Sequence, residues 1–197
     1  TAPWVLNSRE GLFGRQNDTI NVGIIGLGGR AQGSHIPTLL KFPDVRIGAI
    51  CDIRKERVKS ALEKIESHDP RVYGHYAELL KQRDLDCIFV STPPDRHKFM
   101  ICSALRAGFS VYVDKPMALT VTDCQAIGRA VKQSKGVFIV GQQLRYNPSL
   151  RKKIAAIHKG VIGKVVLIDY KVFRGPGSSP FREEPEKKWI LSIERGG

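Results

Sequence analysis

Several features are missing from this 197-residue sequence, and each absence argues against a class of protein. No apolar run approaches the roughly 20 residues of a membrane-spanning helix, so no membrane partner is expected. No low-complexity tract or internal repeat is present, which argues against a solenoid. The cysteines form no Cys-x-x-Cys pair and have no histidine at a metal-binding spacing; they are Cys51, Cys87, Cys102 and Cys124. We therefore expect no metal site and no disulfide framework.

Acidic residues are scarce relative to basic ones. The chain has 32 Lys and Arg against 19 Asp and Glu, a net charge of +13 at pH 7. Such an excess of basic residues is typical of nucleic-acid-binding proteins. Here, however, the basic residues mostly lie within amphipathic helices, as in Arg54–Lys59, and do not alternate with exposed aromatic residues. We expect no nucleic-acid partner, and instead a field that attracts anionic cofactors and small-molecule substrates.

What the sequence does contain is a short apolar run that breaks into glycines, Ile20-Asn-Val-Gly-Ile-Ile-Gly26-Leu-Gly28-Gly-Arg-Ala31. A buried strand that feeds a Gly-x-Gly-x-x-Ala turn is typical of the first βαβ unit of a dinucleotide-binding domain. Gly26 permits the tight turn, Gly28 lets the backbone approach a pyrophosphate, and Ala31 lets the next helix pack close to the sheet. The alternative is a structural glycine turn in another α/β domain.

A second apolar run, Val45–Cys51, ends at Asp52, which follows Ala31 by 21 residues. The ribose-binding carboxylate of this fold is expected about 20 residues beyond the glycines. A carboxylate there accepts hydrogen bonds from ribose hydroxyls and repels a 2′-phosphate, so we predict NAD in preference to NADP. Arg54 and Arg57 nearby weaken that preference. The alternative role for Asp52 is that of an N-cap for the following helix.

Strands and helices then alternate along the chain. We expect further strands over 72–74, 87–90, 111–113 and 137–140, and helices over 34–42, 54–67, 77–83, 95–107 and 122–134. Asp95 is expected to cap the helix that it begins. The alternation predicts an α/β fold, a Rossmann-type doubly wound parallel sheet, over residues 20–145, after an extended lead-in over 1–19. Its ligand crevice is expected at the carboxyl ends of the strands.

Beyond Gly141 the pattern changes. A basic helix is expected over 149–159 and a long strand over Gly163–Phe173. Because one strand cannot bury its own face, residues 146–197 are predicted to begin a second, incomplete sheet domain.

Four sequence motifs and Asp52 resemble the pattern of the glucose–fructose oxidoreductase/inositol dehydrogenase/rhizopine catabolism (Gfo/Idh/MocA) family. In chain order the four motifs are Gly26-Leu-Gly-Gly-Arg-Ala31, Ser91-Thr-Pro-Pro-Asp-Arg-His97, Asp114-Lys-Pro116 and Arg145-Tyr-Asn-Pro148. The resemblance extends to the end of the chain and implies NAD(P)-dependent oxidation or reduction of a sugar, cyclitol or related polyol. It also implies an α+β substrate domain with an open antiparallel sheet, through which members commonly form homo-oligomers.

Two departures from the family pattern stand out. The usual Glu-Lys-Pro is Asp114-Lys115-Pro116 here, and the Asp and His expected soon after a Gly-Gly like Gly196-Gly197 would lie beyond the chain. By resemblance we expect the N-terminal portion of a longer enzyme, or a truncated relative. The lead-in resembles the mature start of exported members, so an exported or periplasmic location is expected, with a cytoplasmic one as the alternative.

The motifs and the resemblance together assign residues to the site. Those expected to contact the cofactor are Gly26, Leu27, Gly28, Gly29, Arg30, Ala31, Asp52, Ile53, Arg54, Ser91, Thr92, Pro93, Pro94, His97, Asp114, Lys115, Pro116, Gln142 and Arg145. Those expected to contact the substrate are Lys115, Arg145, Tyr146 and Trp189.

Lys115 is the candidate catalytic residue, because hydride transfer from a carbinol needs a group that takes the hydroxyl proton. Plainer alternatives stay open. Lys115 could be a surface lysine in a turn, His97 a structural histidine, and Arg145 and Tyr146 packing residues at the domain junction. Two other functions are a glycosidase of this fold that uses NAD, and a non-catalytic nucleotide-binding or regulatory protein if the chain ends at Gly197.

Overall fold

A six-stranded, fully parallel sheet is the centre of the protein, whose computed structural model describes residues 19–171. The strands are β1 (Ile20–Ile25), β2 (Val45–Cys51), β3 (Arg71–Tyr73), β4 (Cys87–Val90), β5 (Ser110–Val113) and β6 (Phe138–Val140). They lie in the order β3-β2-β1-β4-β5-β6, so the direction of winding reverses between β1 and β4. The predicted Rossmann-type α/β fold is confirmed.

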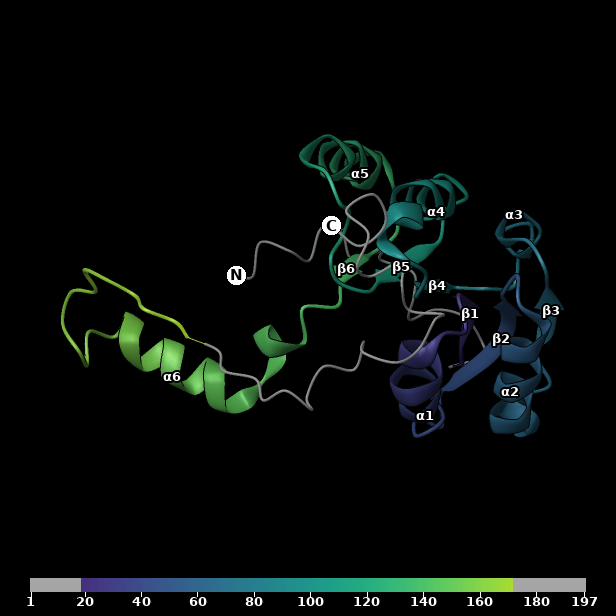
Figure 1. Cartoon of the computed structure of the whole chain (residues 1–197), viewed down its shortest axis with the longest axis horizontal. Helices are drawn as coiled ribbons and strands as arrows, with labels where there is room; N and C mark the ends of the chain where they lie inside the picture. The colour runs from purple at the N-terminus through teal and green to yellow at the C-terminus, as the bar shows by residue number, and fades with distance from the viewer. Residues whose placement is uncertain (1–18, 172–197) are drawn as a thin grey trace.

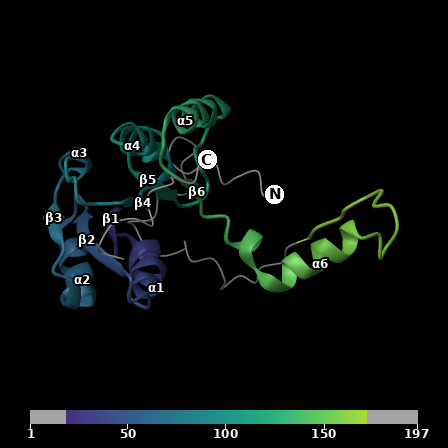
Figure 2. The same cartoon turned by 180° about the vertical axis from the view of Figure 1, so that it is seen from behind.

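Helices cover both faces of the sheet (Figures 1 and 2). One face carries a π-helical turn, η1 (Ala31–His35), with α1 (Ile36–Leu39) and α2 (Lys55–Ile65), the last followed by the short 3-10 turn η2 (Glu66–His68). The other face carries α3 (Tyr76–Leu79), α4 (Pro94–Arg106) and α5 (Val121–Gln133). Each layer closes its own apolar core, one around Ile24 and Ile47 and the other around Ile88 and Ile101.

Burial along the strands follows from this layering. β1 and β2 are buried on both faces over most of their length, which is why they read as continuous apolar runs. β4 and β5 instead alternate, with Ile88 and Val111 buried toward α4 while Phe89 and Tyr112 are only half-buried on the opposite face. Phe89 and Tyr112 on that less covered face line the functional site.

Two helix starts differ in how they are capped. The Thr120 hydroxyl accepts a hydrogen bond from the Asp123 N–H at 3.1 Å and so caps α5. α4 has no side-chain cap, because Pro93 stands at the N-cap and Pro94 at the first helical position, where its fixed φ suits the helix. The prediction that Asp95 caps α4 is therefore wrong, since this residue lies inside the first turn.

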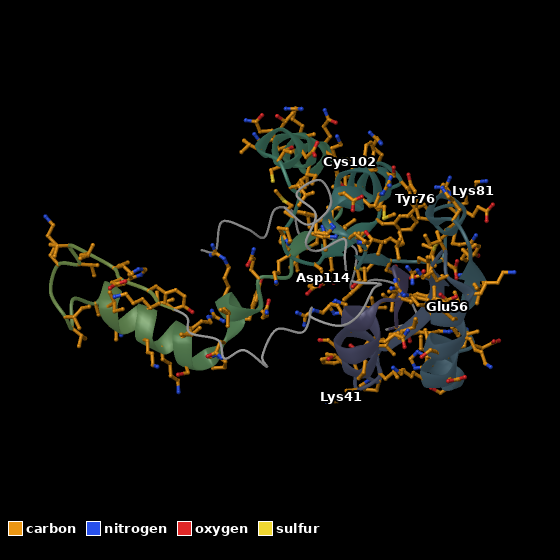
Figure 3. All side chains as sticks on the ribbon, viewed as in Figure 1. Lys41, Glu56, Tyr76, Lys81, Cys102 and Asp114 are labelled. Carbon is orange, nitrogen blue, oxygen red and sulfur yellow. The ribbon has the colours of Figure 1, made fainter. Side chains whose placement is uncertain are left out.

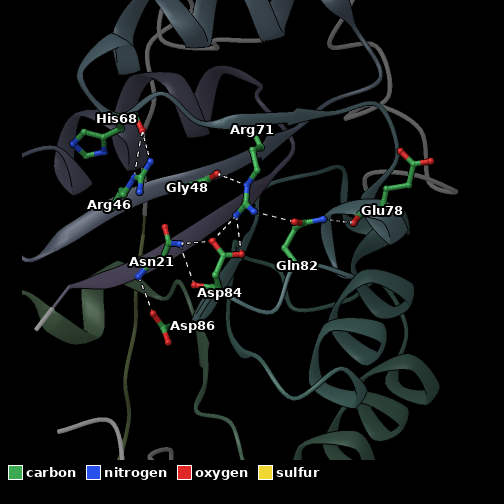
Figure 4. Close-up of polar contacts among 9 residues, drawn as sticks. All are labelled: Asn21, Arg46, Gly48, His68, Arg71, Glu78, Gln82, Asp84 and Asp86. Carbon is green, nitrogen blue, oxygen red and sulfur yellow. Dashed lines mark hydrogen bonds and ion pairs between the residues drawn. The ribbon is translucent and has the colours of Figure 1, made fainter. Parts of the chain in front are cut away.

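The amino ends of the strands are tied together by a polar network (Figure 4). Arg71 on β3 donates two hydrogen bonds to the Asp84 carboxylate, at 2.8 and 2.7 Å, and one to Gln82. Asn21 on β1 donates to the same carboxylate at 3.1 Å. The hydrogen bond from Arg71 holds the pKa of Asp84 below its usual value, against the opposing effect of burial. This network braces the edge of the sheet opposite the functional site.

The chain leaves the sheet through η3 (Gln143–Tyr146) and α6 (Pro148–His158), which projects away from the body of the molecule (Figure 1). The predicted basic helix is thereby confirmed. Residues 163–171 form no strand, so the strand expected to begin at Gly163 is absent there. A strand needs a neighbour for its backbone hydrogen bonds, and nothing in the described residues pairs with this stretch. Within residues 19–171 no helix is long and apolar enough to cross a membrane.

Candidate functional site

A cleft of about 880 Å³ opens at the carboxyl ends of β1, β4 and β5, beside η1 and α1. It lies where the winding of the sheet reverses, which is where open α/β sheets bind their ligands. Many residues predicted for the site line it: Gly28, Gly29, Arg30, Ser91, Thr92, Pro93, Pro94, Asp114 and Lys115.

The glycines of the first turn have two separate reasons to be glycine. Gly26 has φ +92°, and a Cβ there would lie 2.6 Å from the Ser91 carbonyl oxygen, so the fold itself excludes a side chain. Among the residues that the structure describes, only the Arg57 side chain comes within 4 Å of such a Cβ at Gly28, at 3.8 Å, and none does at Gly29. The protein leaves this space open over backbone N–H groups, and that arrangement fits a bound phosphate. Ala31 is fully buried against the sheet, as predicted.

Asp52 holds two turns together at the edge of the cleft. Its Oδ2 accepts a hydrogen bond from the Leu27 N–H at 2.7 Å, and its Oδ1 accepts one from the Arg54 N–H at 2.9 Å. The carboxylate thus fixes the glycine turn against the start of the segment leading to α2. Each oxygen keeps a lone pair with which it could accept from a ribose hydroxyl.

The Asp114 carboxylate is held by two other side chains of the site, and the residue lies between the two helix layers (Figure 3). His35 Nε2 contacts both of its oxygens, at 3.0 and 3.1 Å, and the Ser91 hydroxyl donates to it at 2.5 Å. Burial works to raise the pKa of Asp114, but the hydrogen bonds from His35 and Ser91 outweigh it and hold that pKa below its usual value. Asp114 is thus an ionised anchor at the end of β5.

An aromatic wall that the sequence analysis missed stands beside Asp114. Phe89 and Tyr112 are register partners on β4 and β5, and their rings stack at 4.6 Å. His35 meets both rings edge-on, at 5.7 and 5.3 Å. Burial, and then the charge of Asp114, raise the pKa of Tyr112. The available signal was the alternation along β4 and β5, which puts Phe89 and Tyr112 on one face.

Lys115 is exposed to the cleft, and the peptide bond that joins it to Pro116 is cis. His97 lies beneath the cleft, completely buried, and does not line it. Its Nδ1 is 2.9 Å from the Pro116 carbonyl oxygen and its Nε2 is 2.8 Å from that of Thr92. This geometry matches the structural alternative for His97.

The remaining predicted residues surround the cleft without lining it. Gly26, Leu27, Ala31 and Asp52 support the turn from below, and Ile53 is 86% exposed beyond it. Gln142, Arg145 and Tyr146 are exposed in and around η3, where Gly141 and Gln143 line the cleft in their place. Trp189 lies outside the described residues. Among the described residues no cluster of three or more His, Cys, Asp or Glu is arranged to hold a metal ion.

Comparison with known proteins identifies relatives of the whole domain. The model of an oxidoreductase family with an NAD-binding Rossmann fold, GFO_IDH_MocA, matches residues 20–142. A glycosyl hydrolase family 109 protein of Shewanella sp. strain MR-4 is 29% identical over 172 residues, which are 83% of this chain and 37% of that protein. The chain thus spans little more than a third of the length of the curated relatives it matches.

Solved structures show the same fold with cofactors bound. The 3-ketoreductase KijD10 of Actinomadura kijaniata, solved with TDP-benzene and NADP, is 27% identical, with a TM-score of 0.66 over 74% of this chain and 45% of that chain. The WlbA dehydrogenase of Chromobacterium violaceum, solved with NADH and UDP-GlcNAcA, is 26% identical, with a TM-score of 0.68 over 74% of this chain and 41% of that one.

Proposed function

The chain belongs to the Gfo/Idh/MocA oxidoreductase family with its NAD-binding Rossmann fold, and from that premise we propose that it transfers a hydride between NAD and a sugar, cyclitol or related polyol. One observation carries the proposal: an exposed lysine, Lys115, opens onto the same cleft as the side-chain-free backbone of Gly28 and Gly29. A dinucleotide held there supplies the two-electron acceptor. The cleft would bring its nicotinamide and the lysine to one edge of the sheet.

The residues of the chain divide the tasks of binding and proton handling. The backbone N–H groups around Gly28 and Gly29 bind the pyrophosphate, and Asp52 accepts from the ribose hydroxyls. The Lys115 side chain contacts the substrate oxygen: as the neutral amine it takes the hydroxyl proton when a carbinol is oxidised, and as the ammonium it returns that proton when the carbonyl is reduced. Asp114 leaves Lys115 available for this role, because its carboxylate is engaged by His35 and Ser91.

The preference for NAD rests on Asp52, whose negative charge opposes a 2′-phosphate. The solved relatives include one with NADP and one with NADH, so they favour neither cofactor. Arg57, which lines the cleft near Gly28, is the residue that would favour NADP.

Substituting Lys115 tests the proposal directly. NADH fluorescence measures cofactor binding, and NADH formation is followed with a panel of sugars, cyclitols and nucleotide sugars. Lys115→Met is expected to lower kcat by about 10²–10⁴-fold, the usual contribution of a positioned acid–base group, with nearly unchanged NADH affinity. Lys132→Met on the exposed side of α5 is the matched control. Full activity of Lys115→Met would remove the lysine from the mechanism.

A glycosidase that uses NAD is the second candidate, favoured by the relatives named glycosyl hydrolase family 109. Release of p-nitrophenol from p-nitrophenyl glycosides, without net formation of NADH, would support it. Net NADH formation from a free polyol supports the dehydrogenase instead.

A further inference from the structure

The side chain proposed for catalysis is positioned only through its backbone. Among the described residues, the Lys115 ammonium has no hydrogen bond, ion pair or ring contact. Its two neighbours in the chain are held firmly. The Asp114 carboxylate is fixed by His35 and Ser91, and the Pro116 carbonyl is fixed by His97. Lys115 therefore stands between two anchored residues, and both anchors use a buried histidine.

His97 links two loops that border the cleft from different strands. It lies in the first turn of α4 and is 0% exposed. Its Nε2 meets the carbonyl of Thr92, in the loop after β4, and its Nδ1 meets the carbonyl of Pro116, in the loop after β5. One imidazole ring thus spans the distance between the loop that borders the cofactor cleft and the loop that carries Lys115.

Both partners of His97 are carbonyl oxygens, which accept hydrogen bonds and cannot donate them. Each link therefore needs an N–H on the ring nitrogen that faces it. The two links use different nitrogens and different loops, and a neutral imidazole, which has a single N–H, donates to only one of the two carbonyls at a time. A side chain that keeps one donor and lacks the other would release one loop and retain its partner.

We propose that His97 is a positioning residue, which sets the location of Lys115 in the cleft by holding the Pro116 carbonyl. This role rests on the proposed function, because it concerns the same lysine. It differs from a general packing role, since it predicts that the link to Pro116 matters more for Lys115 than the link to Thr92.

A matched pair of substitutions separates the two links. In His97→Asn the amide nitrogen takes the place of Nδ1 and keeps a donor toward Pro116. In His97→Gln the amide nitrogen takes the place of Nε2 and keeps a donor toward Thr92. Thermal unfolding of both variants establishes that they fold, and NADH fluorescence establishes that the cleft persists.

Lys115 is then examined in two ways. The first is its rate of acylation by a small N-hydroxysuccinimide ester, determined by mass spectrometry and compared with that of Lys132. The second, with a polyol that is turned over, is kcat. We expect His97→Gln to change the Lys115 acylation rate and to lower kcat by up to about 100-fold, the scale of a misplacement near 1 Å. His97→Asn should stay closer to the parent protein in both measurements.

Equal behaviour of two folded variants would overturn the proposal, and so would a larger effect of His97→Asn. If one variant fails to fold, the acylation rate of the other still decides, because each variant has its own expected result: a rate that differs from the parent's for His97→Gln and a rate near the parent's for His97→Asn. Failure of the proposed function looks different: the parent protein would bind no NADH or oxidise no polyol, while the acylation rates would still report the position of Lys115.

Discussion

Two carboxylates at the carboxyl edge of the sheet have different partners and therefore different expected roles. Asp52 accepts from two backbone N–H groups, and we propose that its remaining lone pairs accept from a ribose. Asp114 accepts from two side chains, His35 and Ser91. The sequence placed both acids at strand ends. It did not reveal the partners of Asp114, because His35 and Ser91 come from other segments.

Asp52→Ala is expected to weaken NADH binding and to improve NADPH binding relative to it. Loss of a hydrogen bond to a charged acceptor costs about 1.5–3 kcal/mol, which corresponds to roughly 10- to 150-fold in affinity. Fluorescence titration with both cofactors measures the two affinities. Asp44→Ala removes the same charge from an exposed position and should change neither. Tighter binding of NADPH than of NADH by the parent protein would contradict the predicted preference.

Asp114 should make the stability of the protein depend on acid pH. Its pKa is lower in the folded protein than in the unfolded chain, so the unfolded chain binds more protons as the pH falls. The stabilisation is therefore complete above the unfolded pKa near 4 and is lost as the pH falls through the lower, folded value. Urea unfolding between pH 6 and 2 should show a shallower pH dependence for Asp114→Asn than for the parent. Superimposable slopes would show that Asp114 does not contribute, and Asp44→Asn is the control.

At the scale of elements, the turn after β1 shows how far a motif determines a structure. The glycine spacing predicted a tight turn, an open approach to phosphate and a closely packed helix. Gly26 makes the turn and Ala31 is buried against the sheet, while the approach of a phosphate to Gly28 stays a prediction. The π-helical form of η1 was not predictable, because the five residues of that turn carry no pattern that distinguishes it from an ordinary helix start.

Gly26→Ala and Gly28→Val should affect different properties of the protein, the first its stability and the second its binding of NADH. A methyl group at residue 26 meets the Ser91 carbonyl and takes an unfavourable positive φ, so the variant should lose much of its thermal stability. Residue 28 has room for a side chain in the free protein, so Gly28→Val should fold and yet fail to bind NADH. Circular dichroism melting and NADH fluorescence measure the two effects. Unchanged NADH affinity of Gly28→Val would contradict the assignment of the phosphate site.

At the scale of the whole molecule, the alternation of strands and helices was enough to predict the sheet and the edge that carries the cleft. The aromatic wall of His35, Phe89 and Tyr112 was not predicted, because it forms only when η1, β4 and β5 come together. The strand expected to begin at Gly163 is absent over residues 163–171 because it lacks a pairing partner there. Its sequence is suitable, but pairing is a property of two strands, and no described neighbour is present.

Binding of NAD at the cleft should stabilise the folded domain as a unit. A ligand at 100 times its Kd stabilises the folded state by about 2.7 kcal/mol if it binds only that state. For a chain of this size the expected rise in Tm is about 5–10 °C, at roughly 2–4 °C per kcal/mol. Thermal scans at increasing NAD concentration test this. The shift should be much smaller in Gly28→Val, and a constant Tm in the parent would argue against dinucleotide binding.

The central place of β1 also affects how the chain is made. β1 leaves the ribosome before the other strands of the sheet, and β2 follows soon after, since Ile20 pairs with Val45. The other edge of β1 stays unpaired until β4 is synthesised, because Val22 pairs with Cys87, which lies 65 residues later in the chain (87 − 22). At about 5–20 residues per second, that interval lasts roughly 3–13 s. During translation each nascent chain thus presents an apolar, unpaired strand edge, and neighbouring chains on the same message or a chaperone can reach it first.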